Sequence, residues 1–305
     1  MKLRIVTAPV GDDPAKAGLY YGYHVLDVLK KLPEASIQVV CTSLPRWRSR
    51  EPGNGQSGKQ KGVLWDDSGS CRHHFSSPAG EYGWCSKCDA WKGHLGHETT
   101  PHSYAIHVTE VFQAIRRVLC PDGIIWVHLR DGYATHSRAR GLKPKDLVGV
   151  PWRVALGLQE DGWWVRQDVI WAVDNPRPEG VVDRPLGSHD HILLLTKNPQ
   201  YHFVQAALPE EAKHSLWQVS IKPWPPRMVE WMIAAGTQGK KQCVVLDPFS
   251  RKGLTGVASQ KLGQNFIGID LDADLAEVAE ARLLGRKPPY RKPPPTDLID
   301  ELFAG

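Results

Sequence analysis

The C-terminal third of the chain contains a strand, a helix and a second strand in close succession. Residues 242–246 (QCVVL) and 265–269 (NFIGI) are short apolar runs, and residues 253–262 between them suit a helix. This order predicts two parallel strands joined by a crossover helix. The strands lead directly to Asp247 and Asp270. In nucleotide-type cofactor sites, backbone near a helix N-terminus approaches the ligand, and an acidic residue about twenty positions later binds ribose hydroxyls. The unit therefore predicts a site for such a cofactor, although any strand–helix–strand unit with a chance acidic residue at its strand end has the same spacing.

The rest of the chain repeats this alternation of helices with apolar strands. The pattern predicts a single α/β domain with a mostly parallel sheet that helices cover on both faces. No internal repeat is present. Further helices are expected at 24–32, 103–119, 146–159, 226–235 and 273–284, and further strands at 37–43, 124–129, 163–171 and 190–196, with a turn at 121–123 before the second of these.

Composition limits the classes of protein that the chain can belong to. It has 305 residues, of which 41% are hydrophobic, enough for the core of one large domain with a moderate insertion. Because it has neither a run of eighteen apolar residues nor a signal-peptide pattern, we expect a cytoplasmic protein with no membrane partner. The net charge of +5 suits a polyanion such as DNA, although an ordinary basic enzyme has the same charge.

Three of the six cysteines lie close together between residues 71 and 88. Cys71 and His74 form one pair and Cys85 and Cys88 a second, and each pair is separated by two residues. Two such pairs joined by a loop are typical of a tetrahedral structural zinc site. His73 can take the place of His74. The alternative is a set of reduced cysteines on a loop.

Several segments, taken in order, resemble one known family. Residues 246–249 (LDPF), 253–256 (GLTG), 261–263 (KLG) and 266–270 (FIGID) are similar to the cofactor segment of the S-adenosylmethionine (SAM)-dependent DNA amino-methyltransferases, and residues 43–47 (SLPRW) to the family's Ser-Pro-Pro-Tyr-Trp turn. The similarity extends over residues 20–285. Because the catalytic segment precedes the cofactor segment, the chain resembles the circularly permuted β group.

The resemblance implies a fold, a reaction and a set of residues. It implies a seven-stranded methyltransferase sheet, to which the Cys/His spacing adds a zinc-bearing insertion. It also implies a prokaryotic or phage-encoded protein, a monomer or homodimer, that flips a base out of duplex DNA and methylates its exocyclic amine, mostly cytosine N4. Ser43 and Pro45 would orient the amine within a turn that also holds Arg46 and Trp47. The positions implied for SAM are Tyr23, Asp247, Pro248, Phe249, Arg251, Gly253 and Asp270.

Some positions carry residues that the family pattern does not have. Arg46 replaces the stacking aromatic residue, Arg251 replaces a glycine, Arg130 replaces a second glycine, and Tyr23 replaces an aspartate. Together with Lys252 these changes place positive charge where a sulfonium cation would bind. Three hypotheses follow: an active methyltransferase, a catalytically inactive DNA-binding relative, and a transferase that uses an anionic SAM derivative.

Basic segments are the candidates for contact with DNA phosphates. A solvated surface is the simpler explanation of such charges. We expect a methyltransferase-like domain at 1–285, with a loop and Cys/His insertion at 48–98 and a target-recognition region at 132–222, and a Pro-rich tail at 286–305. The candidate DNA contacts are Arg48, Arg50, Arg138, Arg140, Lys143 and Lys145.

Overall fold

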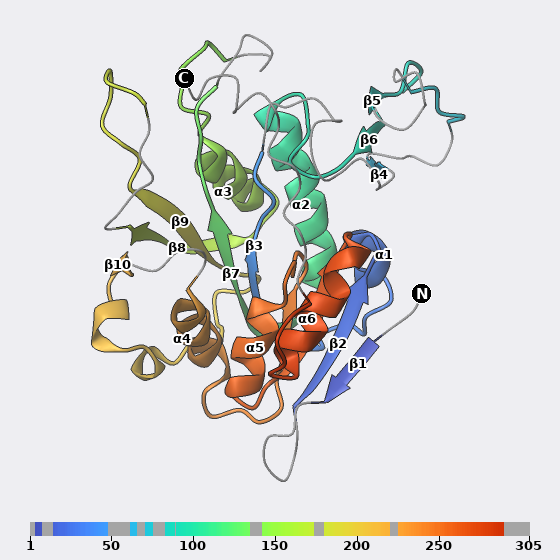
Figure 1. Cartoon of the computed structure of the whole chain (residues 1–305). Helices are drawn as coiled ribbons and strands as arrows, with labels where there is room; N and C mark the ends of the chain where they lie inside the picture. Colours follow the sequence, from blue (N-terminus) through green and yellow to red (C-terminus); the bar gives the residue numbers. More distant parts are fainter. Residues whose placement is uncertain are drawn as a thin grey trace.

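A nine-stranded sheet forms the centre of the computed structural model (Figure 1). The structure describes residues 4–7, 15–47, 62–65, 71–75, 83–88, 90–134, 142–173, 180–219 and 225–289. In spatial order the strands are β1 (Arg4–Thr7), β2 (Lys16–Tyr21), β12 (Asn265–Asp270), β11 (Val244–Asp247), β3 (Ile37–Ser43), β7 (Leu119–Leu129), β9 (His189–Thr196), β8 (Trp164–Ala172) and β10 (Leu216–Gln218).

The sheet is mostly parallel, which confirms the predicted fold class. The strands β2, β12, β11, β3 and β7 run in one direction, whereas β1 and β9 are antiparallel to their neighbours. The implied count of seven strands is exceeded by two, because the short β1 and β10 extend the two edges. The strands β8, β9 and β10 come from the region predicted for target recognition, so part of that region belongs to the main sheet.

Helices cover both faces of the sheet, as Figure 1 shows. The first face packs against α1 (Val25–Leu29), α2 (Pro101–Val118) and α3 (Val150–Glu160), and the second against α4 (Pro226–Thr237), α5 (Leu254–Lys261) and α6 (Ala276–Leu283). Because successive strand side chains point to opposite faces, Val40 enters the first core and Val39 the second. The short 3-10 helices η1 (Gln205–Ala207), η2 (Glu210–Ala212) and η3 (Ala273–Leu275) complete the elements.

A small second sheet packs against α2. It consists of β4 (Val63–Trp65), β6 (Trp91–Gly93) and β5 (Gly83–Trp84), in that order. Trp65 and Trp91 each stack on the ring of His107 from α2, with centroids 4.9 and 5.1 Å apart. The insertion predicted at 48–98 thus includes a β-structure that is fixed to the main domain by aromatic contacts.

Several element boundaries differ from the predictions, most clearly at three places. The helix expected at 146–159 begins only at Val150, because the carboxylate of Asp131 accepts hydrogen bonds from the N–H groups of Gly149 and Val150 and so caps it. The turn expected at 121–123 is an irregularity within β7. The helix expected at 273–284 divides into η3 and α6. No helix in the described part of the chain is long and apolar enough to span a membrane.

Candidate active site

The candidate site lies along one edge of the main sheet. Since β2, β12, β11, β3 and β7 are parallel, their C-terminal ends meet at this edge, and β9 begins there because it runs in the opposite direction. The edge therefore gathers Ser43, His128, Asp190, Asp247 and Asp270, which are far apart in the sequence. Ligands of open α/β sheets bind at this edge.

Asp270 ends β12 and remains partly exposed. One of its carboxylate oxygens accepts the N–H of Arg251 at 2.7 Å and the other accepts the N–H of Asp272 at 2.9 Å. A carboxylate has about four acceptor positions, so each oxygen can still accept a ribose hydroxyl. Burial raises the pKa of this carboxyl above its usual range. Asp270 is thus placed to hold a nucleoside-type cofactor.

Asp247 has a different environment from Asp270. It is buried, and its carboxylate accepts hydrogen bonds from the hydroxyls of Thr42 and Thr255, both at 2.6 Å, and from the N–H of Phe249. Burial raises its pKa to about 6. These contacts connect β3, β11 and α5, so Asp247 stabilises the walls of the site from behind.

The loop between β11 and α5 keeps a glycine-like backbone although it contains Arg251. The φ angle of Arg251 is +47°, in the left-handed region, and its side chain is exposed. Gly253 has φ +74°, and a Cβ atom there would lie 3.0 Å from the Cβ atom of Ala279. The hydroxyl of Tyr21 donates to the Ser250 hydroxyl and the Arg251 carbonyl, at 3.1 and 2.9 Å. The replacement of glycine therefore leaves the loop intact.

A chain of hydrogen bonds crosses three adjacent strands behind Ser43. Ser43 on β3 lies opposite His128 on β7, and its Oγ is 2.8 Å from the Nδ1 atom of His128. The Nε2 atom of the same imidazole is 3.1 Å from Oδ2 of Asp190 on β9. His128 and Asp190 are both buried, whereas Ser43 is half-buried. Ser43 is thus the member of the chain that can reach a substrate.

The charges of these groups determine the direction of the hydrogen bonds. Burial alone would raise the pKa of Asp190, but hydrogen bonds from His128 and Arg130 hold it well below its usual range, so Asp190 is an anion. Burial lowers the pKa of His128, so the imidazole is neutral. An anionic carboxylate only accepts, so Nε2 carries the single proton and Nδ1 accepts the Ser43 hydroxyl proton. The lone pairs of Ser43 Oγ then face outward as acceptors.

Arg130 is paired with the same carboxylate. Its Nε donates to Oδ1 of Asp190 at 2.6 Å and its Nη2 donates to Oδ2, a two-point contact that fixes the side chain. The cluster of four positive charges that the sequence suggests is therefore smaller in the structure. Arg130 is neutralised by Asp190, whereas the side chains of Arg251 and Lys252 are exposed.

The turn at 43–47 is held from its inner side. The hydroxyl of Tyr104 donates to the Pro45 carbonyl at 2.7 Å, and the indole N–H of Trp47 donates to the Glu98 carbonyl at 2.9 Å. Arg46, which stands at the position of the stacking aromatic residue, is exposed. Pro45 and Trp47 thus hold the turn through their hydrogen bonds, while Ser43 is half-buried beside His128 and the Arg46 side chain is exposed.

The structure brings the predicted cysteines together, with one change in the histidine. Cys71, Cys85, Cys88 and His73 place their donor atoms within 4.8 Å of one another. His73 occupies the position predicted for His74, whose side chain is exposed and whose backbone N–H donates to the Cys85 sulfur. The choice of histidine depends on which side chain the segment turns inward, and spacing alone does not determine that.

The structure describes two of the six predicted DNA-binding residues. Lys143 and Lys145 are exposed, and the Lys145 ammonium lies 2.6 Å from Asp183. Arg48, Arg50, Arg138 and Arg140 lie outside the described residues, as does most of the tail at 286–305.

Tyr23, which the sequence resemblance assigns to the cofactor site, is half-buried and packs at the edge of the first core.

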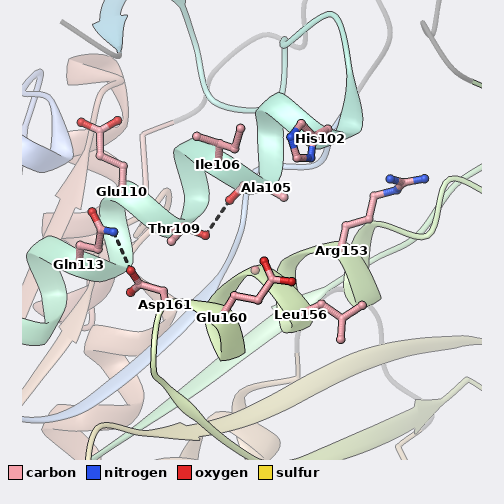
Figure 2. Close-up of a pocket in the computed structure, with 11 residues that line it drawn as sticks. His102, Ala105, Ile106, Thr109, Glu110, Gln113, Arg153, Leu156, Glu160 and Asp161 are labelled. Atoms are coloured by element: carbon pink, nitrogen blue, oxygen red, sulfur yellow. Dashed lines mark hydrogen bonds between the residues drawn. The ribbon is translucent and has the colours of Figure 1, made fainter. Parts of the chain in front are cut away.

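A separate groove of about 560 Å³ lies between α2 and α3 (Figure 2). Glu110, Glu160 and Asp161 give it an acidic lining, and Gln113 donates to Asp161 across it at 2.6 Å. None of its lining residues belongs to the strand edge described above. The groove is therefore distinct from the candidate site.

His128 and Asp190 are functional candidates that the sequence did not reveal. A lone histidine within a strand is usually a packing residue, and the sequence around Asp190 (SHDHILLLT) indicates a strand but not its neighbours. His128 and Asp190 lie near strand ends at the edge of the sheet that holds Ser43, but they are 62 residues apart in the chain. Only the order of the strands shows that they touch.

The chain is similar to known DNA methyltransferases in sequence. Residues 37–281 match the N6_N4_Mtase family of DNA methylases. The type II methyltransferase M.Cfr9I of Citrobacter freundii is 30% identical over 295 residues, which cover 85% of this chain and 85% of the relative. The type II methyltransferase M.SmaI of Serratia marcescens is 35% identical over 233 residues, which cover 64% of this chain and 79% of the relative.

Solved structures share the fold. The PvuII DNA methyltransferase (cytosine-N4-specific) superposes with a TM-score of 0.63 at 16% identity, covering 88% of this chain and 86% of that one. A DNA modification methylase of Thermus thermophilus, in its complex with SAM, superposes with a TM-score of 0.60 at 19% identity, covering 87% and 93%. Sequence and fold agree, and the chain belongs to the N6/N4 amino-methyltransferase family of DNA methylases.

Proposed function

We propose that the protein transfers a methyl group from SAM to the N4 atom of a cytosine in duplex DNA. The observation that carries this proposal is the chain from Ser43 through His128 to Asp190, because it presents a hydrogen-bond acceptor at the edge where the cofactor strands end. An exocyclic amine attacks a methyl group through its nitrogen lone pair, so an acceptor that orients its N–H groups is the element that this reaction needs.

SAM would supply a methyl group on a positively charged sulfur. Asp270 would accept the ribose hydroxyls, while the loop of Phe249, Arg251 and Gly253 would border the cofactor and Asp247 would hold that loop in place. The residues fit such a ligand because Asp270 is partly exposed and keeps acceptor capacity. One of the four nearby cations, Arg130, also pairs with a carboxylate of the chain, which reduces repulsion of the sulfonium.

The same chain of residues can remove the proton that methylation releases. The amine acquires a positive charge when it forms the new N–C bond, and it must then lose one proton. Ser43 Oγ would accept that proton while its own hydroxyl proton passes to Nδ1 of His128, and the anion of Asp190 would stabilise the resulting imidazolium. Arg130 would act as a positioning residue by fixing Asp190.

Cytosine N4 is the proposed base because of the turn at 43–47. The turn begins with Ser43, and the resemblance to Ser-Pro-Pro-Tyr turns favours cytosine-N4 enzymes. The fold also matches that of the cytosine-N4-specific PvuII methyltransferase, a likeness that supports the architecture and not the base itself. With Arg46 at the stacking position, the guanidinium plane would cover the flipped base in place of an aromatic ring. Adenine N6 is the competing outcome.

Duplex DNA would approach the face that carries this edge. Lys143 and Lys145 lie on the segment that leads into α3 and are exposed, so we assign them phosphate contacts together with Arg48, Arg50, Arg138 and Arg140. With each such contact, the affinity for DNA falls more steeply as the salt concentration increases, whatever the base sequence.

Binding of SAM tests the proposal separately from chemistry. At a SAM concentration about 100 times Kd, the free energy of unfolding should increase by about 2.7 kcal/mol, measured by denaturant unfolding with and without SAM. Asp270→Asn should weaken binding, while Asp274→Asn, an identical change at an exposed position on η3, should not. Stabilisation of wild type with no methyl transfer to duplex DNA would indicate an inactive relative. No stabilisation by SAM would contradict the assigned donor.

A further inference from the structure

The small sheet carries a cluster of donor atoms at the end away from α2. Cys85 follows β5 directly and pairs with Phe75 in an isolated bridge, which brings the segment of Cys71 and His73 beside it. Cys88 follows three residues after Cys85. Two separate segments thus supply three sulfurs and one imidazole nitrogen to one point, with all donor atoms within 4.8 Å of one another.

The distances between these atoms match a tetrahedral metal site. The sulfurs of Cys71 and Cys85 are 3.9 Å apart, and the Cys88 sulfur is 3.5 Å from Nδ1 of His73. Zinc in a tetrahedron, with Zn–S bonds of about 2.3 Å and Zn–N bonds of about 2.0 Å, separates two sulfurs by about 3.8 Å and a sulfur from a nitrogen by about 3.5 Å. A disulfide would need a sulfur–sulfur distance of about 2.05 Å. The spacing therefore favours a shared ion over a covalent bond.

Backbone groups support one of the sulfurs as a metal ligand. The N–H of His74 and the N–H of Lys87 both point to the Cys85 sulfur, at 3.5 and 3.4 Å. Such hydrogen bonds orient a ligand and balance its negative charge. Since three cysteines and one histidine fill four positions, no position stays open for water or substrate, and the site suits a structural ion.

The small sheet is linked to the catalytic turn by a continuous set of contacts. The ring of His107 is stacked by Trp65 from β4 and Trp91 from β6, and its Nδ1 lies 3.0 Å from the carboxylate of Glu98. Both partners of that pair are fully buried. The carbonyl of Glu98 in turn accepts the indole N–H of Trp47, in the turn at 43–47.

We propose that Cys71, His73, Cys85 and Cys88 bind one Zn²⁺ ion, and that this ion holds the small sheet against α2 and so fixes the turn at 43–47. The metal site stands on its own geometry, and only its effect on catalysis rests on the proposed function. The chemistry of the donors, three thiolates and an imidazole, selects zinc over magnesium or calcium, which prefer oxygen ligands.

The zinc content of the purified full-length protein tests the site. Elemental analysis should give one zinc per chain, falling by at least tenfold in Cys88→Ser and in His73→Ala. His74→Ala and Cys120→Ser are matched controls that change a neighbouring histidine and a cysteine outside the cluster, and both should retain one zinc. Since a ligand variant can fail to fold, His73→Cys supplies a second test: four thiolates should keep the metal. Substoichiometric zinc in folded wild type, or unchanged zinc in Cys88→Ser, would overturn the assignment.

A separate measurement tests the link to the turn. Removing zinc with a chelator should lower Tm, and added Zn²⁺ but not Mg²⁺ should restore it. In a Trp91→Leu variant, which removes one of the two rings stacked on His107, zinc should still bind at one per chain but its removal should shift Tm less than in wild type. An equal shift in both proteins would show that the ion acts on the small sheet alone. These readouts do not require methyl transfer, so they remain decisive if the proposed activity fails.

Discussion

The Nε2 atom of His128 lies 3.1 Å from the carboxylate of Asp190, and this contact fixes which imidazole nitrogen carries the proton. With Nε2 protonated, Nδ1 must accept from Ser43, and the lone pairs of Ser43 are directed away from His128. The arrangement gives Ser43 one defined polarity. It depends on a buried carboxylate, Asp190, which lies on another strand and is itself held by Arg130.

Changing Asp190 to Asn should reverse that polarity. An amide can donate to Nε2, which would move the imidazole proton to Nδ1 and turn Ser43 from an acceptor into a competing donor toward the amine. We expect kcat for methyl transfer to fall by about 10²- to 10⁴-fold, the usual contribution of general acid–base groups, with little change in the Kd of SAM. Single-turnover transfer of labelled methyl groups to duplex DNA measures the first quantity and titration calorimetry the second.

The same sheet offers a control for this variant. Asp168 on β8 contacts Nδ1 of His191 at 2.9 Å, a carboxylate–imidazole pair with no contact to Ser43. Asp168→Asn should leave kcat within about twofold of wild type, far from the loss expected for Asp190→Asn. Equal losses in both variants would mean that Asp190 acts through stability and not through the tautomer of His128.

The pH dependence of kcat should report His128. The relay needs neutral imidazole, and burial lowers the pKa of His128 below its ordinary value of 6.5, so activity should rise with pH through an acid limb whose midpoint lies below pH 6.5. Arg130 contributes to that lowered pKa and also shares Asp190. In Arg130→Gln the pKa should rise and the acid limb should move to higher pH. Arg227→Gln, which breaks the exposed pair with Glu211 at 2.6 Å, should not move it. A limb that stays in place in Arg130→Gln would exclude His128 as its source.

Gly96 should be sensitive to substitution because it lies against the catalytic turn. A Cβ atom at this position would be 2.4 Å from the carbonyl oxygen of Arg46, and the backbone has φ +98°. Gly239 has a similar φ of +85° with no atom within 4 Å of the added Cβ, so it shares the backbone cost of about 1–2 kcal/mol without the clash. Gly96→Ala should therefore destabilise more than Gly239→Ala in denaturant unfolding and should also lower kcat. If both lose the same stability and keep kcat, the turn does not depend on this contact.

Arg251→Gly should leave the fold intact and strengthen SAM binding slightly. The backbone at this position is already left-handed, so glycine removes about 1–2 kcal/mol of strain from the folded state. It also increases the conformational entropy of the unfolded chain, which lowers the free energy of unfolding by about 0.5–1 kcal/mol. Losing an exposed, screened cation beside Asp270 should tighten the Kd of SAM by less than about tenfold, or about 1.4 kcal/mol. Lys252→Ala removes the same charge one residue later and should change the Kd less. Weaker binding in Arg251→Gly would favour an anionic donor.

The sequence predicts the central strands of the sheet well, and its edge strands and one helix boundary poorly. Strands such as β3 and β12 are short apolar runs because helices cover both faces of the sheet. The residue pattern therefore predicts them. The sequence does not predict the strands β1 and β2, although β2 alternates between buried and more exposed residues. The start of α3 was misplaced because the cap on its first N–H groups comes from Asp131, across a loop.

The residues of the candidate site also fall into two groups, those that the sequence predicts and those that it does not. Residues that follow strands, such as Ser43 and Asp270, can be found from the sequence because position along a strand places them at one edge. Partners across strands cannot, because β7 and β9 become neighbours only in the folded sheet. The charge of Arg130 illustrates the consequence: read alone it opposes a cationic cofactor, whereas in the structure it is bound to Asp190.

The most direct test is nucleoside mass spectrometry of DNA from cells that express the protein, compared with cells that express Ser43→Ala at the same level. The account predicts N4-methylcytosine with the wild type and none with the variant. Unmodified DNA from cells that contain folded wild type, or the same modified base with both proteins, would contradict it.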